Sequence, residues 1–303
     1  MASKVSIISI YYNRENSVEQ SIESLRTQSY SDVEIILVDD NSSDNTYSKL
    51  IYQQTLDSRI RVIRNETNKG FTQSLIDVIK NVDSKYIAIH GSGDISLPKR
   101  IETQVAFLEN NGDVGVVGVG VTNRKVNNVS DTIMEISTEH LLSRNMLNHG
   151  AVMFRVDDYH KSGGYRSFFK YRQDKDLWYR MSLISRIFFL PDKLYEWSIQ
   201  ESSVSKTTAL NFEPVLLSEF ATFLIRERIK YGYDSLDKFG ERGALLFNPS
   251  TSIHIFIRNL KSYLLRKEWS SAQSTVELMI IINRNIFYNW GLVILLKYIK
   301  KKK

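Results

Sequence analysis

Short apolar runs alternate with stretches of helical periodicity along the first two thirds of the chain. Buried parallel strands read as short continuous hydrophobic segments ended by turn formers. Such segments lie at Val5–Ile10, Glu34–Val38, Ile60–Arg64, Tyr86–His90 and Val114–Val121. Helices are expected between them, at residues 18–25, 47–56, 71–82 and 100–108. This alternation predicts an α/β fold with a mostly parallel central sheet.

The pattern changes after residue 206 to long helical periodicity. Within it, an apolar face opposes a basic face, which is typical of an amphipathic basic helix. The apolar residues are Ile253, Phe256, Ile257, Leu260 and Leu264, and the basic ones are Arg258, Lys261, Arg266 and Lys267. We therefore expect a domain over residues 1–206 and a helical basic extension over residues 207–303.

Charge separates the same two parts. The net charge is +6, and residues 207–303 hold 15 Lys and Arg against 8 Asp and Glu, whereas residues 1–206 hold 25 against 26. The apolar stretch from Leu278 to Ile299 is interrupted by asparagines and is too short to span a bilayer, but its aromatic residues and terminal lysines suit an interfacial anchor. A helical subdomain packed on the first domain is the alternative. Nucleic acid is not the expected partner, because no binding motif accompanies the charge.

Two features of the sequence indicate the cellular compartment. The chain has no cysteine, which excludes disulfides and thiolate metal sites and is typical of a reducing compartment. The first fifteen residues have too short an apolar run for a signal peptide. We expect a cytoplasmic protein, peripheral on the inner face of the cell membrane.

Candidate chemistry begins where the second predicted strand ends, at Asp39 and Asp40. In open α/β sheets, ligands bind beyond the carboxyl ends of the strands. Carboxylates there can accept hydrogen bonds from an imide N–H or from ribose hydroxyls. A purely local role in capping the next helix is the alternative.

Together with the strand and turn Val5–Asn13 and the segment Gln28–Asp32, this stretch resembles the N-terminal signature of the family-two inverting glycosyltransferases. The resemblance covers about residues 4–205. It implies a glycosyltransferase A-type, Rossmann-like domain that binds a nucleotide sugar. The donor-binding residues that it implies at these strand ends are Ile10, Tyr12, Asn13, Asp39 and Asp40.

In the family, the fourth strand ends in a metal-binding DxD signature, typically LDADD. The corresponding residues here are His90-Gly91-Ser92-Gly93-Asp94, so glycines replace both aspartates of the DxD and only Asp94 remains. A Mn²⁺ or Mg²⁺ ion at Asp94 is therefore left open, since one carboxylate holds such an ion weakly. Alternatively, the glycines let backbone amides approach the donor diphosphate, or the segment is only a tight turn. The resemblance places Gly91, Ser92, Gly93 and Asp94 in the donor site.

The acceptor side of the family carries an ED-x-D-L-W element, which aligns with Gln173–Trp178. The resemblance implies that Asp174 is the general base, whereas Asp176 is expected to hold the loop. His149 is a candidate contact to donor or acceptor, with a structural role as the alternative. The QxxRW signature of processive synthases is absent, which favours a single transfer per encounter.

These expectations describe a hexosyltransferase. It would move a sugar from a nucleotide sugar, a UDP-hexose or UDP-HexNAc, to a hydroxyl of a lipid-diphosphate or oligosaccharide acceptor in O-antigen or capsule biosynthesis. Two alternatives are a catalytically silent sugar-nucleotide-binding protein, suggested by the altered DxD, and a nucleotidyltransferase. The second would be expected to carry a Gly-rich basic loop after the first strand, which residues 11–14 do not form.

Overall fold

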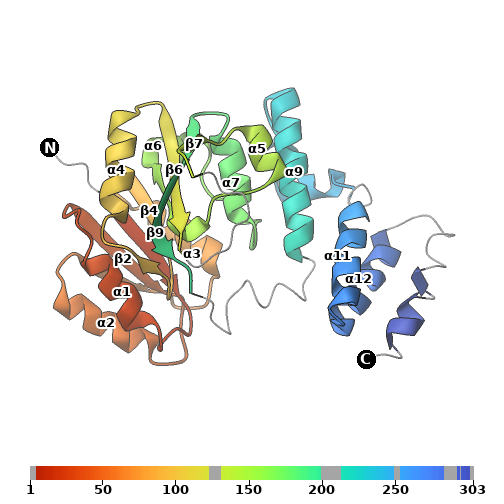
Figure 1. Ribbon diagram of the computed structural model, residues 1–303, viewed down its shortest axis with the longest axis horizontal. Coiled ribbons are helices and arrows are strands. Elements are labelled where there is room, and N and C mark those ends of the chain that lie inside the picture. The colour runs from red at the N-terminus through yellow and green to blue at the C-terminus, as the bar shows by residue number, and fades with distance from the viewer. Residues whose placement is uncertain are drawn as a thin grey trace. The chain divides into compact units, whose positions relative to one another are not determined.

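The computed structural model describes residues 5–122, 131–198, 213–248, 253–282, 292–293 and 295–300. The chain forms two compact units, residues 1–200 and residues 201–303 (Figure 1). The expected boundary at 206/207 lies outside the described residues.

The first unit is built on one mixed sheet with the strand order β3-β2-β1-β4-β8-β6-β9-β5, to which β7 adds by pairing with β9. The four strands at one end of the sheet, β3, β2, β1 and β4, are parallel to one another, as are β6 and β9, whereas β8, β5 and β7 pair antiparallel. The strands are β1 Val5–Tyr11, β2 Val33–Asp39, β3 Ile60–Arg64, β4 Tyr86–Gly91, β5 Ile95–Ser96, β6 Val114–Val121, β7 Met134–Glu135, β8 Val152–Arg155 and β9 Arg186–Glu196.

Helices cover both faces of this sheet (Figure 1). They are α1 Val18–Arg26, α2 Thr46–Leu56, α3 Phe71–Ile79, α4 Arg100–Asn110, α5 Thr138–Ser143, α6 Val156–Lys161 and α7 Gln173–Met181, with a short 3₁₀ turn η1 at His149–Ala151. The helix expected over residues 71–82 ends earlier, because Asn81 and Val82 donate to the carbonyls three residues back and close the last turn tightly. The predicted α/β fold with parallel central strands is confirmed.

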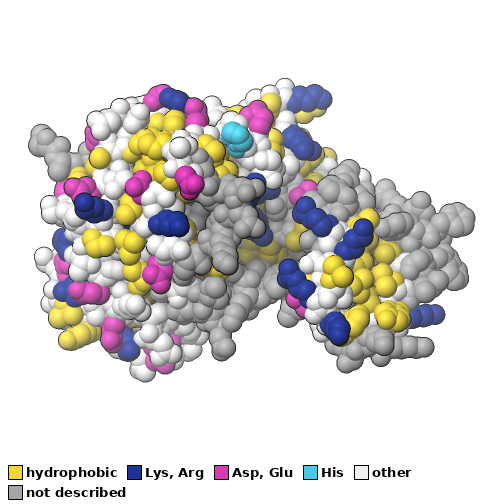
Figure 2. Space-filling view, in the orientation of Figure 1, with side chains coloured by type: hydrophobic (Ala, Val, Ile, Leu, Met, Phe, Trp, Pro, Cys, Tyr) yellow, Lys and Arg dark blue, Asp and Glu magenta, His cyan; other side chains and the backbone are white. Residues whose placement is uncertain are grey.

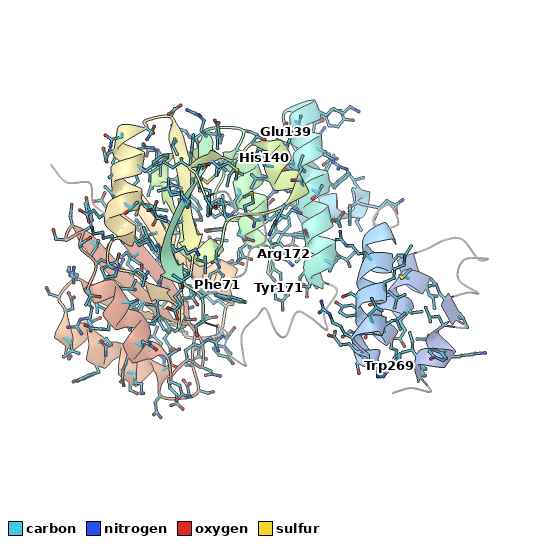
Figure 3. The ribbon with its side chains drawn as sticks, viewed as in Figure 1. Phe71, Glu139, His140, Tyr171, Arg172 and Trp269 are labelled. Atoms are coloured by element: carbon cyan, nitrogen blue, oxygen red, sulfur yellow. The ribbon has the colours of Figure 1, made fainter. Side chains whose placement is uncertain are left out.

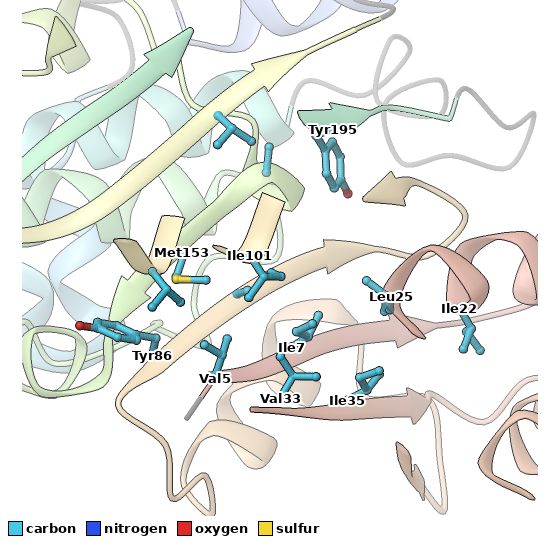
Figure 4. Packing of buried hydrophobic residues seen from close by; sticks show 14 of the residues in the cluster. Val5, Ile7, Ile22, Leu25, Val33, Ile35, Tyr86, Ile101, Met153 and Tyr195 are labelled. Carbon is cyan, nitrogen blue, oxygen red and sulfur yellow. The ribbon is translucent and has the colours of Figure 1, made fainter. Parts of the chain in front are cut away.

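Alternation along the strands explains the two layers. In β1, Val5 and Ile7 face the cluster that contains α1, α2 and α4, whereas Ile8 and Ile10 are buried but lie outside that cluster, on the opposite side of the strand. Figure 4 shows the first cluster, with side chains from strands and helices interdigitating. Burial of each large aliphatic side chain contributes roughly 1.5–3 kcal/mol, which makes this layer a rigid base for the loops at the strand ends.

Strand order fixes where a ligand can bind. After β1 the chain adds β2 and β3 on one side and then returns to place β4 on the other side. The carboxyl ends of β1 and β4 therefore lie side by side, with Ile10 opposite Gly91. Such a reversal of strand order opens a crevice that is the usual ligand site of open α/β sheets.

The second unit is helical. It contains α9 Glu213–Tyr231, α10 Ser235–Phe239, the 3₁₀ segment η3 Gly240–Leu246, α11 Ile253–Leu265 and α12 Trp269–Ile282. Phe256 and Leu260 of α11 pack on Ala272, Val276 and Met279 of α12, and Arg258 and Lys261 are exposed. The amphipathic basic helix is confirmed for these residues. Among the residues that the structure describes, no helix combines the length and the hydropathy needed to cross a bilayer.

Candidate active site

The loops after β1 and β2 are joined by hydrogen bonds between backbone and side chains. The Asn13 amide donates to Ser42 Oγ at 3.0 Å, and the Ser43 amide donates to Asn13 Oδ1 at 2.9 Å. The Arg14 amide donates to Thr46 Oγ1 at 2.7 Å. Asn13 has a φ of 51°, a left-handed conformation that asparagine tolerates better than most residues. The predicted donor-site residue Asn13 is thus a rigid corner, with the exposed ring of Tyr12 next to it.

Asp39 is the last residue of β2 and is buried. Its two carboxylate oxygens accept from the Ser42 amide, each at 3.3 Å, and Arg64 Nε lies 3.3 Å from Oδ2. Arg64 ends the neighbouring strand β3 in register with Asp39, and its guanidinium lies 4.4 Å from the centre of the Tyr47 ring. The end of β2 therefore presents a paired carboxylate and arginine beside an aromatic face. This set of groups could recognise a nucleobase.

Asp40 has a different environment. Its carboxylate accepts from the amides of Lys69 and Gly70, at 2.9 and 2.8 Å, and from the Asn65 side-chain amide at 2.7 Å. Ser74 Oγ adds a fourth bond at 3.2 Å. These groups surround the first turn of α3, where a negative charge is also favoured by the helix dipole. The capping alternative thus applies to Asp40, but at α3 rather than at the helix that follows it in sequence.

The loop from Gly91 to Asp94 is tied to the end of β9 through Tyr195. The Tyr195 hydroxyl donates to Asp94 Oδ2 at 2.6 Å and accepts from the Gly91 amide at 2.9 Å. The Ser198 amide donates to Asp94 Oδ1 at 2.8 Å. Gly93 has a φ of +97°, a conformation that residues with a Cβ rarely adopt. Asp94 therefore holds a glycine turn closed against β9.

Burial dominates the electrostatics of Asp94. The carboxyl is 7% exposed, and its loss of hydration raises the pKa to about 6, although the Tyr195 and Ser198 hydrogen bonds and the charges of Arg100 and Arg14 oppose the shift. Arg100 is fully buried, donates to the carbonyls of β4 and β8, and lies 4.9 Å from the centre of the Tyr195 ring. Near pH 7 the group is mostly ionised but poorly hydrated.

Asp174, in the first turn of α7, lies near His149 of η1. Asn145 Nδ2 donates to Asp174 Oδ2 at 3.1 Å. His149 Nε2 lies 2.6 Å from the Tyr165 hydroxyl, and burial lowers the pKa of the imidazole while the Asp174 charge raises it. The His149 ring also contacts Phe71 and Trp178 edge-on. Phe71 opens α3, and Tyr171 and Arg172 precede α7 (Figure 3). The imidazole is thus held neutral in an aromatic setting.

The glycine turn and the Asp174 site share one neighbour. Gly150 follows His149, and a Cβ added to Gly150 would lie 2.3 Å from the Tyr195 hydroxyl and 3.2 Å from the Gly91 amide nitrogen. The turn that carries His149 toward Asp174 therefore packs directly on the residues that hold Asp94. Residues predicted for the donor side therefore lie next to the turn that approaches the predicted acceptor-side base.

Asp176 is structural, as expected. It is 2% exposed and forms ion pairs with Arg180, at 2.7 Å, and with Arg166 from the preceding loop. Burial would raise its pKa, but the two arginines outweigh burial and lower it. The buried pair fixes the loop that leads to Asp174.

Comparison with known proteins identifies the family of this chain. The profile of the family described as "Glycosyl transferase family 2" matches residues 6–188, more than half of the chain. The chain belongs to glycosyltransferase family 2. The matched region contains every predicted site residue.

Individual relatives differ in how much they match. The "Putative glycosyltransferase EpsE" of Bacillus subtilis is 36% identical over 183 residues, which span 58% of this chain and 66% of EpsE. "UDP-Glc:alpha-D-GlcNAc-diphosphoundecaprenol beta-1,3-glucosyltransferase WfgD" of Escherichia coli is 36% identical over 107 residues, 35% of this chain and 42% of WfgD. The structure of S. aureus TarS 1-349 in complex with UDP-GlcNAc has a TM-score of 0.63 at 16% identity, covering 99% of this chain and 88% of that one. That likeness supports the glycosyltransferase A-type fold.

As a family-two member, this chain has an unusual donor set for a metal. Both oxygens of Asp94 accept protein hydrogen bonds, and glycines stand at both DxD positions. Within the described parts of the chain, no group of three or more His, Cys, Asp or Glu side chains could hold an ion. Mn²⁺ and Mg²⁺ prefer near-octahedral oxygen sites that include carboxylates facing the ion. The residues present do not fit such a site.

Sequence reasoning missed Arg64, Tyr195 and Asn145 as members of this site. Arg64 could have been found, because it ends the strand beside Asp39 and parallel neighbours end at the same edge. Tyr195 and Asp94 are 101 positions apart, and Asn145 and Asp174 are 29 apart. No local sequence pattern predicts a hydrogen bond between residues so far apart in the chain.

A surface cavity of about 480 Å³ lies at the outer edge of the sheet, between β3 and α3. Its lining includes Arg61, Arg64 and Lys69, which are paired with Glu34, Asp39 and Asp77 respectively. Three residues of the cavity lining also contact Asp39 or Asp40, namely Arg64, Asn65 and Lys69. The cavity lining contains neither Asp174 nor the residues of the Gly91–Asp94 turn.

Proposed function

We propose that this family-two chain is an inverting hexosyltransferase that transfers a sugar from a nucleotide sugar, a UDP-hexose or UDP-HexNAc, to a hydroxyl group. The proposed acceptor is a lipid diphosphate-linked or oligosaccharide glycan in bacterial surface-polysaccharide assembly, such as O-antigen or capsule. The relatives named above are matched over part of their length, so this activity is our own inference for the whole chain.

One observation carries the proposal: the candidate base and the candidate diphosphate loop both lie next to the His149–Gly150 turn. Asp174 interacts electrostatically with His149, while Gly150 packs against Tyr195 and Gly91. An inverting transfer needs a base on one side of the anomeric carbon and a stabilised leaving group on the other. The arrangement around this turn supplies a candidate for each.

The roles follow from the chemistry of each group. Asp174 removes the proton from the acceptor hydroxyl while that oxygen attacks the anomeric carbon, and the nucleoside diphosphate leaves from the opposite face. Asn145 orients the Asp174 carboxylate through its 3.1 Å hydrogen bond. Arg64 binds the base and ribose side and is held there by the buried Asp39 carboxylate, and Ile10, Tyr12 and Asn13 line that end of the site. Asp40 supports it by anchoring α3.

A lipid-linked acceptor is supported by two further observations. The printed name of WfgD includes a diphosphoundecaprenol acceptor. In the second unit, hydrophobic side chains gather over α11 and α12 with Lys and Arg beside them (Figure 2). Leu265, the last residue of α11, and Tyr298 are large hydrophobic residues of this unit with exposed fractions of 85% and 51%. We propose that it rests on the inner face of the cell membrane, where cationic side chains meet anionic headgroups.

The decisive experiment measures nucleoside diphosphate release from a panel of UDP-sugars with a lipid-diphosphate acceptor. Asp174→Asn keeps the size of the side chain and removes the base, and we expect it to lower kcat by a factor of about 10²–10⁴. Asp157→Asn, an exposed carboxylate on α6, is the matched control and should keep full activity. Equal turnover by Asp174→Asn and wild type would overturn the assignment of the base.

The same panel separates the alternatives. Nucleotide binding without turnover of any UDP-sugar would favour a silent sugar-nucleotide-binding protein. Incorporation of a nucleotide, with release of pyrophosphate, would favour a nucleotidyltransferase. Inversion itself is read from the anomeric configuration of the product by NMR.

A further inference from the structure

We propose that this chain binds the diphosphate of its donor without a divalent metal ion, with Arg14 and the Gly91–Asp94 turn in the place of the metal and Asp94 as a positioning residue. The inference rests on the proposed function, because it concerns the diphosphate of the same donor. Three features of the described residues carry it.

First, both carboxylate oxygens of Asp94 already accept hydrogen bonds from within the protein. Its Oδ2 accepts from the Tyr195 hydroxyl at 2.6 Å and its Oδ1 from the Ser198 amide at 2.8 Å. The carboxylate is 7% exposed. A metal ligand must instead turn an oxygen toward the ion and the phosphates. The hydrogen bonds of Asp94 join the turn after β4 to the end of β9, which is a structural task.

Second, side chains at the two DxD positions conflict with the turn as it is folded here. A Cβ at Gly91 would lie 2.2 Å from Asp94 Oδ2, closer than real Cβ atoms approach any heavy atom. At Gly93, the φ of +97° strains any residue with a side chain. The backbone of this turn can approach a phosphate closely, and it brings fewer negative charges to the diphosphate than a DxD sequence would.

Third, two arginines act electrostatically on Asp94, Arg14 from the loop after β1 and Arg100 from the start of α4. Arg14 follows β1, the strand next to β4, and its backbone is fixed by the Thr46 hydroxyl at 2.7 Å. Its half-buried guanidinium interacts electrostatically with Asp94 and Asp44. Arg100 adds a buried positive charge behind Tyr195. A guanidinium binds phosphate oxygens through paired charge-assisted hydrogen bonds, so Arg14 can neutralise the leaving diphosphate in the way that a metal ion would.

Calorimetric titration of the full chain with UDP, dTDP, GDP and ADP tests the proposal, each in EDTA and again in MnCl₂. We expect at least one of them to bind with affinities that agree within about threefold between the two conditions. Binding that improves about tenfold or more with Mn²⁺ would overturn this inference and leave the proposed function intact. Absence of binding by every nucleotide in both conditions would overturn both.

Variants then test the residues. In EDTA, Arg14→Gln should weaken the nucleoside diphosphate about tenfold and leave the matching nucleoside unchanged, and Arg14→Lys should restore part of the loss. Arg186→Gln, an exposed and ion-paired arginine at the start of β9, is the matched control. Asp94→Asn should keep the nucleotide affinity within about threefold, because the amide oxygen can accept from the Ser198 amide while the amide NH2 donates to the Tyr195 hydroxyl oxygen, which reverses the direction of that bond. Equal losses of nucleoside and nucleoside diphosphate in Arg14→Gln, or a large loss in Asp94→Asn with native circular dichroism, would refute the assigned roles.

Discussion

Replacing Asp94 by asparagine should change how the stability of the first unit depends on pH. The carboxyl has a pKa of about 6 in the folded protein against an ordinary value of 3.8. Because the pKa is raised on folding, the stabilising contribution of the protonated form is fully present below the unfolded value and is lost as the pH rises through about 6. Asparagine resembles the protonated acid and carries no such dependence.

The magnitude follows from the same two values. A rise from 3.8 to about 6 corresponds to about 3 kcal/mol between the acidic and the neutral limits. Between about pH 4.5 and about pH 8 the wild type should therefore lose about 2 kcal/mol relative to Asp94→Asn, since part of the titration lies below this window. The free energy of unfolding of Asp94→Asn, relative to that of the wild type, should therefore be higher at neutral pH than at acidic pH.

Urea unfolding followed by circular dichroism at both pH values gives the free energy of unfolding of each protein. The quantity of interest is the difference between variant and wild type, in which the titration of all other carboxyls cancels. If this difference were the same at both pH values, Asp94 would have an ordinary pKa and the burial argument would be wrong. A change of opposite sign would mean that the ionised form gains more from Tyr195, Ser198 and the arginines than burial costs.

Three further predictions concern other carboxylates and the second unit. Asp176→Asn should destabilise the protein by about 3–5 kcal/mol, because it leaves the buried Arg180 and the partly buried Arg166 short of their counter-charge, and thermal unfolding measures this. Asp40→Ala should cost about 2–4 kcal/mol and speed amide hydrogen exchange at the start of α3, whereas unchanged exchange there would contradict its anchoring role. Glutamates in place of Arg258 and Lys261 should reduce the fraction of protein that sediments with anionic vesicles and leave the fraction that sediments with neutral vesicles unchanged. If the wild-type chain sedimented equally with anionic and neutral vesicles, the proposed membrane surface would be refuted.

The sequence allowed the frame of the fold to be predicted, because the frame depends on local patterns. The apolar runs at Val5–Ile10 and Glu34–Val38 predicted the strands within one residue at each end. Parallel strands also share an edge where they end, so the position of Asp39 at the carboxyl end of β2, beside the ends of β1 and β3, followed from topology. The antiparallel insertion of β8 between β4 and β6 did not follow, because its four residues carry no periodic signal.

The candidate site could be predicted only in part, for a related reason. Adjacent Asp39 and Asp40 look equivalent in the sequence, yet one pairs with Arg64 and the other accepts four hydrogen bonds from residues 65–74. The direction of each side chain depends on which distant loops close over it. The same holds for Asp94, whose partners Tyr195 and Ser198 come from a strand end far along the chain.

The crowding at Gly91 has a consequence for how this protein can change by mutation. A single substitution that restores aspartate at position 91 meets the Asp94 carboxylate, and one at position 93 meets a backbone conformation that disfavours it. A variant with a DxD sequence would therefore need a changed Asp94 and a reshaped turn at the same time. Each one-step intermediate is expected to fold less well than its parent. Each single substitution toward a DxD sequence is thus expected to destabilise this turn. The glycine turn can therefore be replaced by a DxD sequence only through several changes made together.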